Sequence, residues 1–338
     1  MKKFKNVATL ILVLSVVFIS CDGNDDFNDT TPVIDPSNFE LNGILESDKT
    51  LDPSQDYTLT GSYIVKSGAT LTIPAGTQII SEVSTSNYIA IEKGAEINIQ
   101  GTASLPVVMK SSAGNQGDWG GLVILGDALT TEGVNATAEV GGFVYGGTNT
   151  SDSSGNINYL IIKNAGAQIN ADSQYNGLTL YAVGSGTSIN NVALVDGADD
   201  GVEFFGGSVS ITNLYAENNQ DDSVDWTEGW NGTLTNTYVV HNNEGFSTAI
   251  EADGDNNNPT IINFTAISSV GGTALQFKKM SGATMTNVFL AGYDTNVDMK
   301  DEGPIENIIV DGEAMTDASN NVFNGTAVDI SNWGWVQQ

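Results

Sequence analysis

An asparagine recurs at intervals of 20 to 27 residues through the second half of this 338-residue chain. The recurring residues are Asn191, Asn213, Asn236, Asn263, Asn287 and Asn307. The positions two before, one after and three after each asparagine are apolar in seventeen of eighteen cases, and none is charged. A repeat of this length with fixed apolar columns indicates stacked coils, each of which buries one face against the next.

The coils are expected to consist of short β-strands. Apolar and polar residues alternate with period two around each asparagine, and no segment keeps helical spacing over ten or more residues. The leucine-rich consensus is absent as well. The sequence therefore predicts an all-β solenoid, a parallel β-helix with coils of roughly 22–26 residues.

The asparagine repeat resembles the ladder of the right-handed parallel β-helix superfamily, which includes pectate lyases and polygalacturonases. In that family, stacked asparagines fill one turn between strands. The resemblance implies a right-handed β-helix and says less about activity, because one fold hosts many functions. We place the β-helix at residues 58–325, with an N-terminal cap that begins near residue 41 and ends at 57. A second cap is expected at 326–338, with two tryptophans closing the last coil.

The N-terminal residues predict an exported lipoprotein. Residues 1–5 are basic, residues 7–19 are apolar but short for a membrane span, and the single cysteine, Cys21, follows directly. This pattern resembles a bacterial lipoprotein signal, with residues 1–20 removed and Cys21 lipidated. The alternative is an ordinary secretory signal with an incidental cysteine.

The acidic, polar stretch after Cys21 is interpreted as a disordered tether. It resembles the export signal that carries Bacteroidota lipoproteins to the outer face of the outer membrane. Residues 120–126, 177–181 and 199–207 also resemble a group of Bacteroidota lipoproteins that share this β-helix. These resemblances imply a lipid-anchored protein of the outer membrane that faces the cell exterior.

The chain is strongly acidic, which limits its partners. It has 41 acidic residues against 11 basic residues, all of them lysine, and a formal net charge of −30. Such a surface repels nucleic acid and anionic membranes, so neither is expected to bind it directly. It suits cations, or serves only solubility.

Two hexads place several acidic residues close together. Residues 199–204 and 221–226 each begin eight residues after an asparagine, and they match in character position by position. In these and later coils an apolar residue stands on both sides of a polar one, so the apolar pair faces the core and the polar residue faces outward. The expected outward column contains Glu203, Asp225, Glu251, Gln276 and Asp298.

The acidic residues in and beside this column form a candidate calcium site, comprising Asp199, Asp200, Glu203, Asp221, Asp222, Asp225 and Glu251. Coils about 4.8 Å apart bring carboxylates together that repel by roughly 1–3 kcal/mol per adjacent pair. Raised pKa values or a bound cation relieve such repulsion. Oxygen ligands without histidine or thiolate favour calcium, and a hydrated face without an ion is the alternative.

Four further residues are candidates for chemistry or ligand contact. Lys278 and Lys300 each lie two residues beyond the column, and Asp253 has the same place in an earlier coil. Pectate-lyase-like enzymes use calcium to neutralise a uronate carboxylate and a lysine or arginine to take the α-proton, an outline that Lys278 fits. The alternative is that both lysines only balance nearby acids. Trp230, in a turn, either stacks on a sugar or covers the coil.

No complete catalytic set is recognised. Polygalacturonase chemistry is disfavoured because arginine is absent and His241, interpreted as a turn residue, lacks the flanking glycines of that family. The first hypothesis is therefore a non-enzymatic surface lipoprotein, a scaffold or binder of glycan, calcium or an outer-membrane transport protein. The second hypothesis is a calcium-assisted polysaccharide lyase or related glycan-active enzyme.

Overall fold

The computed structural model describes residues 39–171, 173–254, 256, 258–319 and 322–338. These residues all belong to one compact unit, Pro36–Gln338. The predicted signal peptide, Cys21 and the acidic tether lie outside the described residues. Within the described ranges, no helix is long and apolar enough to cross a lipid bilayer.

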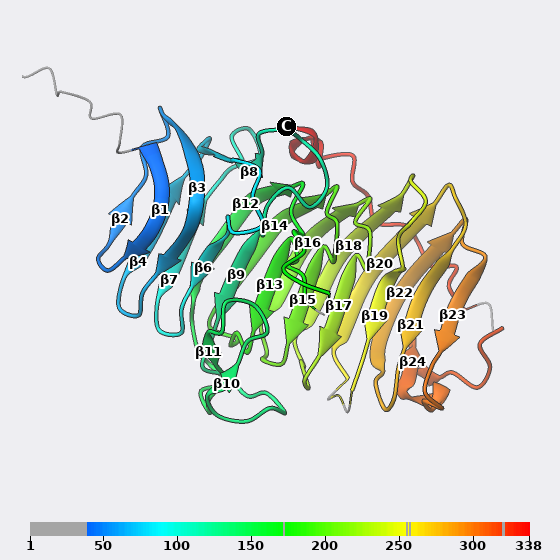
Figure 1. Ribbon diagram of the computed structural model, residues 1–338. Coiled ribbons are helices and arrows are strands. Elements are labelled where there is room, and N and C mark those ends of the chain that lie inside the picture. Colours follow the sequence, from blue (N-terminus) through cyan, green and yellow to red (C-terminus); the bar gives the residue numbers. More distant parts are fainter. Residues whose placement is uncertain (1–38, 172, 255, 257, 320–321) are drawn as a thin grey trace, which may run out of the picture. The chain divides into compact units, whose positions relative to one another are not determined.

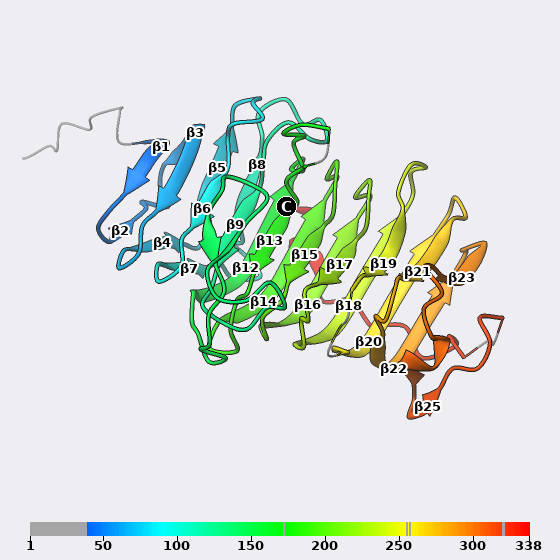
Figure 2. The same ribbon diagram turned by 60° about the horizontal axis from the view of Figure 1, so that its bottom comes forward.

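The described chain winds into a parallel β-helix, in which equivalent strands of successive coils lie side by side (Figure 1). One stack consists of β6 (Ile89–Ile91), β9 (Leu122–Leu125), β13 (Leu178–Tyr181), β15 (Val202–Phe205), β17 (Val224–Thr227), β19 (Thr248–Ala252), β21 (Thr273–Phe277) and β23 (Thr295–Met299). The other main stack consists of β12 (Gly155–Lys163), β14 (Ser188–Val195), β16 (Ser210–Glu217), β18 (Thr233–His241), β20 (Thr260–Ser268) and β22 (Ala283–Ala291). Figure 2 shows the two stacks from a second side. The predicted all-β solenoid is confirmed.

Each long strand of the second stack turns a corner at one residue. From β14 to β22 this residue is an asparagine with φ between +54° and +61°, a left-handed conformation that asparagine tolerates better than most residues. The pairing skips it: β14 and β16 pair as far as Asn190 with Thr212 and resume at Val192 with Leu214. The corner therefore divides every long strand into two halves that belong to different sides of the coil.

The corner side chains form a continuous amide ladder. From Asn191 to Asn287, each Nδ2 donates to the Oδ1 of the asparagine one coil earlier, at 2.8–3.0 Å. The first bond reaches Asn158 in β12. The predicted ladder is confirmed for these five residues and wrong for Asn307. The chain leaves the coil there as a 3-10 turn, η2 (Ile305–Asn307), and Asn307 donates to the carbonyl of Met280 instead.

The β-helix begins earlier than predicted. β1 (Glu40–Leu45) pairs in parallel with β3 (Asp56–Val65), and β2 (Lys49–Thr50) with β4 (Thr70–Pro74). The expected N-terminal cap is therefore a coil itself, because its inward leucines join the same buried core as the later coils. The remaining strands of the first coils are β5 (Gln78–Ser81), β7 (Glu96–Gln100) and β8 (Val107–Ser111).

One long insertion interrupts the coils between β9 and β12. Residues 126–154, here called the excursion, contain one antiparallel pair, β10 (Ala136–Thr137) with β11 (Val144–Tyr145). The excursion packs on the outward side of the first stack, where Tyr145 contacts Tyr181 with 4.8 Å between ring centroids.

The expectation that the C-terminal residues close the last coil is wrong. That end is finished by β24 (Ile308–Val310) and the antiparallel β25 (Glu313–Ala314). Residues 322–338, here called the tail, instead run back along the asparagine corners to a final 3-10 turn, η3 (Gly334–Gln337) (Figure 1). Trp335 packs edge-on against Tyr159 of β12, because the outward aromatic side chains of the second stack offer it an apolar surface.

Substitutions at Asn236 should separate two contributions of a corner residue to stability: its ladder hydrogen bonds and its tolerance of the left-handed backbone conformation. Asn236→Ala removes both ladder bonds and leaves an unsuited side chain at a φ of +57°, so a loss of about 2–4 kcal/mol is expected. Asn236→Gly removes the same bonds, but glycine adopts a positive φ without strain. This variant should therefore lose about 1 kcal/mol less stability than Asn236→Ala. Urea unfolding measures both, and equal losses would mean that the corner imposes no conformational demand.

Candidate functional site

The outward residues of the first stack form the predicted column. Strand pairing aligns Glu203 with Asp225 and Asp225 with Glu251. Later coils continue the column with Gln276 and Asp298. The inward neighbours Val224 and Trp226 are fully buried, which confirms the predicted register. Alternation along each strand therefore holds like charges on one face of successive coils.

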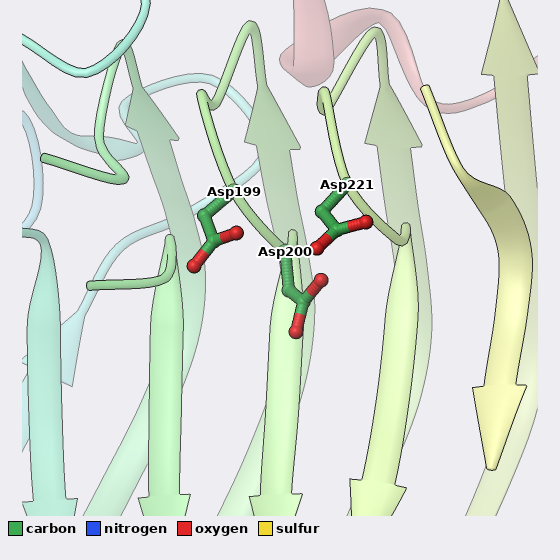
Figure 3. A group of neighbouring side chains, drawn as sticks. All are labelled: Asp199, Asp200 and Asp221. Atoms are coloured by element: carbon green, nitrogen blue, oxygen red, sulfur yellow. The ribbon is translucent and has the colours of Figure 1, made fainter. Parts of the chain in front are cut away.

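The turns that precede β15 and β17 close this column into a pocket of about 290 Å³. We call it the acidic pocket; its lining includes Glu139, Ser173, Gln174, Asp199, Asp200, Glu203, Asp221 and Asp225. Asp199, Asp200 and Asp221 offer carboxylate oxygens within 4.8 Å of one another, and so do Asp200, Glu203 and Asp225. Figure 3 shows the first group, with Asp199 and Asp200 on one turn and Asp221 on the next.

Two of the seven predicted metal ligands lie outside these groups. Asp222 is buried and accepts a hydrogen bond from Thr248 Oγ1 at 2.5 Å, so it fixes the neighbouring coil. Glu251 is engaged by Lys278 and by the amide of Gln276. Neither carboxylate lines the acidic pocket.

The lysine side chains beside the column form ion pairs with acidic residues. Lys278 forms an ion pair with Glu251, and Lys300 lies 2.7 Å from Asp298. Burial alone would lower the pKa of Lys278, but its hydrogen bond and charge interaction with Glu251 outweigh this and raise the pKa above its ordinary value. The candidate ligand contact Asp253 is paired with Lys279 at 3.0 Å. This arrangement matches the alternative in which the lysines balance nearby acids.

The acidic pocket holds its carboxyl groups under mutual repulsion. Burial, followed by the charge of Asp221, raises the pKa of Asp199 to about 7. Burial and neighbouring carboxylates also raise the pKa values of Asp200, Glu203 and Asp225 well above their ordinary range. Asp225 Oδ1 is buried without a hydrogen-bond partner among the described residues. A buried acceptor left in this state is costly, and a cation would satisfy it.

Sequence reasoning missed several polar residues of the site, among them Glu139 and Asn176. Glu139 comes from the excursion, which is held over the first stack by hydrogen bonds from Thr130 Oγ1 and Tyr145 to Glu228, at 2.5 and 2.8 Å. Asn176 donates to Glu203 Oε2 at 2.6 Å. Both residues lie outside the asparagine repeat, so no periodic signal marks them.

Trp230 and His241 belong to the interior. Trp230 is fully buried, stacks on Phe204 at 4.0 Å between centroids and donates to the carbonyl of Val209. Of the two alternatives, stacking on a sugar is therefore wrong, and packing against the coil is what the structure has, because the turn folds the indole inward.

His241 is also not the predicted turn residue, because it ends β18 inside the core. Its ring nitrogens lie 3.0 Å from Ser223 Oγ and 2.9 Å from the Tyr293 hydroxyl. Burial lowers the pKa of His241 to about 4, so it is neutral at physiological pH.

Without metal ions, the protein should be less stable at about pH 8 than at about pH 5.5, because the folded state binds more protons than the unfolded chain across this range. The raised pKa values of Asp199, Asp200 and Asp225 set this direction, and their stabilising protons are lost as the pH rises. Thermal melting in EDTA measures the effect. Asp225→Asn should flatten the profile, whereas Glu244→Gln in an exposed turn should not; identical slopes in all three proteins would contradict this assignment.

Comparison with known proteins agrees with the architecture. The sequence model of the pectate-lyase like beta helix domain matches residues 43–332, which includes both main strand stacks and the acidic pocket. Searches of curated proteins and of solved structures found no match. A domain of this kind fits a glycan-related role. Because the match extends over most of its length, the chain belongs to the pectate-lyase-like β-helix domain family.

Proposed function

We propose that the protein binds a glycan at the cell surface and that a calcium ion in the acidic pocket takes part. The observation that carries the proposal is the convergence of Asp200, Glu203 and Asp225 with one buried carboxylate oxygen unpartnered. A calcium ion bound there would present positive charge at the pocket mouth. It would attract the carboxylate of an acidic sugar to a protein whose net charge otherwise repels it.

The residues of the pocket fit calcium by their chemistry and spacing. All three converging groups offer oxygen ligands, which calcium prefers, and among the described residues neither histidine nor cysteine lines the pocket. Calcium–oxygen distances are about 2.3–2.6 Å, so two ligands on opposite sides of one ion are about 5 Å apart. The carboxylate oxygens already lie within 4.8 Å of one another. Asp199 and Asp221 are further candidate ligands on the same pocket wall.

Binding is favoured over the lyase alternative by the state of Lys278. A lysine that removes a proton from a sugar must be neutral, and its pKa must therefore fall towards the working pH. Glu251 instead raises the pKa of Lys278 through an ion pair. Lys300 is likewise paired, with Asp298. Each lysine contributes to balancing the column rather than to a proton-abstracting site.

Calcium should stabilise the protein more than sodium chloride of equal ionic strength, which only screens charges. At about one hundred times its dissociation constant the ion should add about 2.7 kcal/mol to the free energy of unfolding. Differential scanning calorimetry measures the gain. Asp200→Asn with Asp225→Asn should abolish the excess, and Asp317→Asn, on an exposed turn, should retain it. Equal effects of calcium and matched salt on the unmutated protein would refute the site.

Calcium binding should also release protons, because protonated carboxylates must ionise to coordinate the ion. The affinity should therefore increase from about pH 5.5 to about pH 8. Isothermal titration in two buffers of different ionisation enthalpy counts the released protons.

Once calcium binding is established, adding polygalacturonate tests for binding of an acidic sugar. The absence of unsaturated products would separate binding from lyase activity.

The surface location is part of the proposal and depends on Cys21. Cys21→Ser should move the protein from the membrane fraction to the soluble fraction, because the lipid acceptor is lost. Immunoblotting of fractionated cells measures this. External protease should remove the unmutated protein from intact cells; complete protection would refute the surface location and leave lipidation intact.

A further inference from the structure

A second hollow lies between the asparagine corners and the tail, away from the acidic pocket. Its volume is about 320 Å³, which falls within the range of about 300–1,000 Å³ for small-molecule sites. We call it the amide groove. Four ladder asparagines, from Asn213 to Asn287, form one wall, and tail residues 326–329 with Trp333 form the other. The groove shares no lining residue with the acidic pocket.

The wall formed by the ladder retains unused hydrogen-bonding capacity. A side-chain amide has two N–H donors and an oxygen with two lone pairs. The ladder bonds use one donor and one lone pair of Asn213, Asn236 and Asn263. Asn287 ends the ladder, gives its second donor to the carbonyl of Thr326, and accepts a hydrogen bond from the Thr326 amide. Among the described residues, Asn213, Asn236 and Asn263 therefore each retain one N–H and one lone pair without a partner, and all three are partly exposed.

These amides are also held rigidly. Their backbones are fixed at the corners, and each side chain is bonded to the coils before and after it. The free groups repeat at the coil spacing of about 4.8 Å. A ligand would thus meet an ordered row of paired donors and acceptors without the cost of immobilising flexible side chains.

The opposite wall supplies an aromatic surface and no positive charge. The indole of Trp333 is partly exposed and rests against Trp335, with 6.2 Å between centroids. Among the lining residues, Asp329 alone is charged, and its Oδ1 accepts a hydrogen bond from the Ser331 amide at 2.9 Å. A carboxylated, sulfated or phosphorylated ligand would find no cation to pair with here.

We infer that the amide groove binds a neutral saccharide. Sugar hydroxyls both donate and accept hydrogen bonds, as do the free halves of the ladder amides. The apolar face of a sugar ring fits the flat indole of Trp333, and burial of that face supplies affinity without charge. This site is independent of the proposed calcium pocket, because it needs neither an ion nor an acidic sugar.

Affinity electrophoresis in EDTA tests the inference with galactomannan, xyloglucan, arabinogalactan and dextran as neutral polymers. At least one of them should retard the unmutated protein. Ala327→Trp fills the groove and should abolish retardation, whereas Gln337→Trp adds the same side chain to the tail outside the groove and should not. Trp333→Ala should weaken binding by about fivefold to tenfold. Thermal melting of each variant verifies that the fold is intact.

The inference is overturned if no neutral polymer retards the protein, or if Ala327→Trp binds as well as the unmutated chain. Retardation by polygalacturonate alone, and only with calcium, would also overturn it while supporting the acidic pocket. Conversely, binding to a neutral polymer in EDTA that survives Asp200→Asn with Asp225→Asn supports the amide groove even if calcium proves inert.

Discussion

In each coil from β14 to β22 the chain turns a left-handed corner at one asparagine, and the register of these coils follows from that corner. Asparagine adopts this backbone conformation at little cost, and its side chain then bonds to the equivalent residue of the next coil. Each bond contributes on the order of 1 kcal/mol, but the larger effect is geometric. The corners hold successive coils in one register, so residues at equivalent positions must stack.

Stacking explains both the core and the acidic pocket. Apolar residues at inward positions form one continuous buried cluster along the coils. The same register brings Glu203 beside Asp225 on the outward side. In later coils the repulsion between stacked carboxylates is reduced by the neutral Gln276 and by lysines two positions further along the chain. In the described part of the chain no lysine lines the acidic pocket, and the repulsion between its carboxylates therefore appears as raised pKa values and an unpartnered carboxylate oxygen.

The two segments that do not repeat turn this scaffold into specific sites. The excursion brings Glu139 over the acidic pocket and is fixed there by Glu228. The tail lies along the corners and converts an exposed row of amides into a groove with an aromatic end. Repeated coils present the same kind of surface along their whole length. The excursion and the tail each cover one part of that surface and give it different residues from the rest.

The repeating parts of the molecule could be predicted from the amino-acid sequence. The corner asparagines from Asn191 to Asn287, the inward position of Val224 and the outward column could be predicted because period and alternation record them directly. The same signal failed at Asn307, where the chain leaves the coil after a proline, and at the first coil, where Gly43 and not an asparagine has a positive φ. The folded chain was needed to show which acids converge, that Trp230 and His241 are buried, and that the tail runs back along the coils. These outcomes depend on contacts between residues far apart in the chain, and local periodicity carries no record of such contacts.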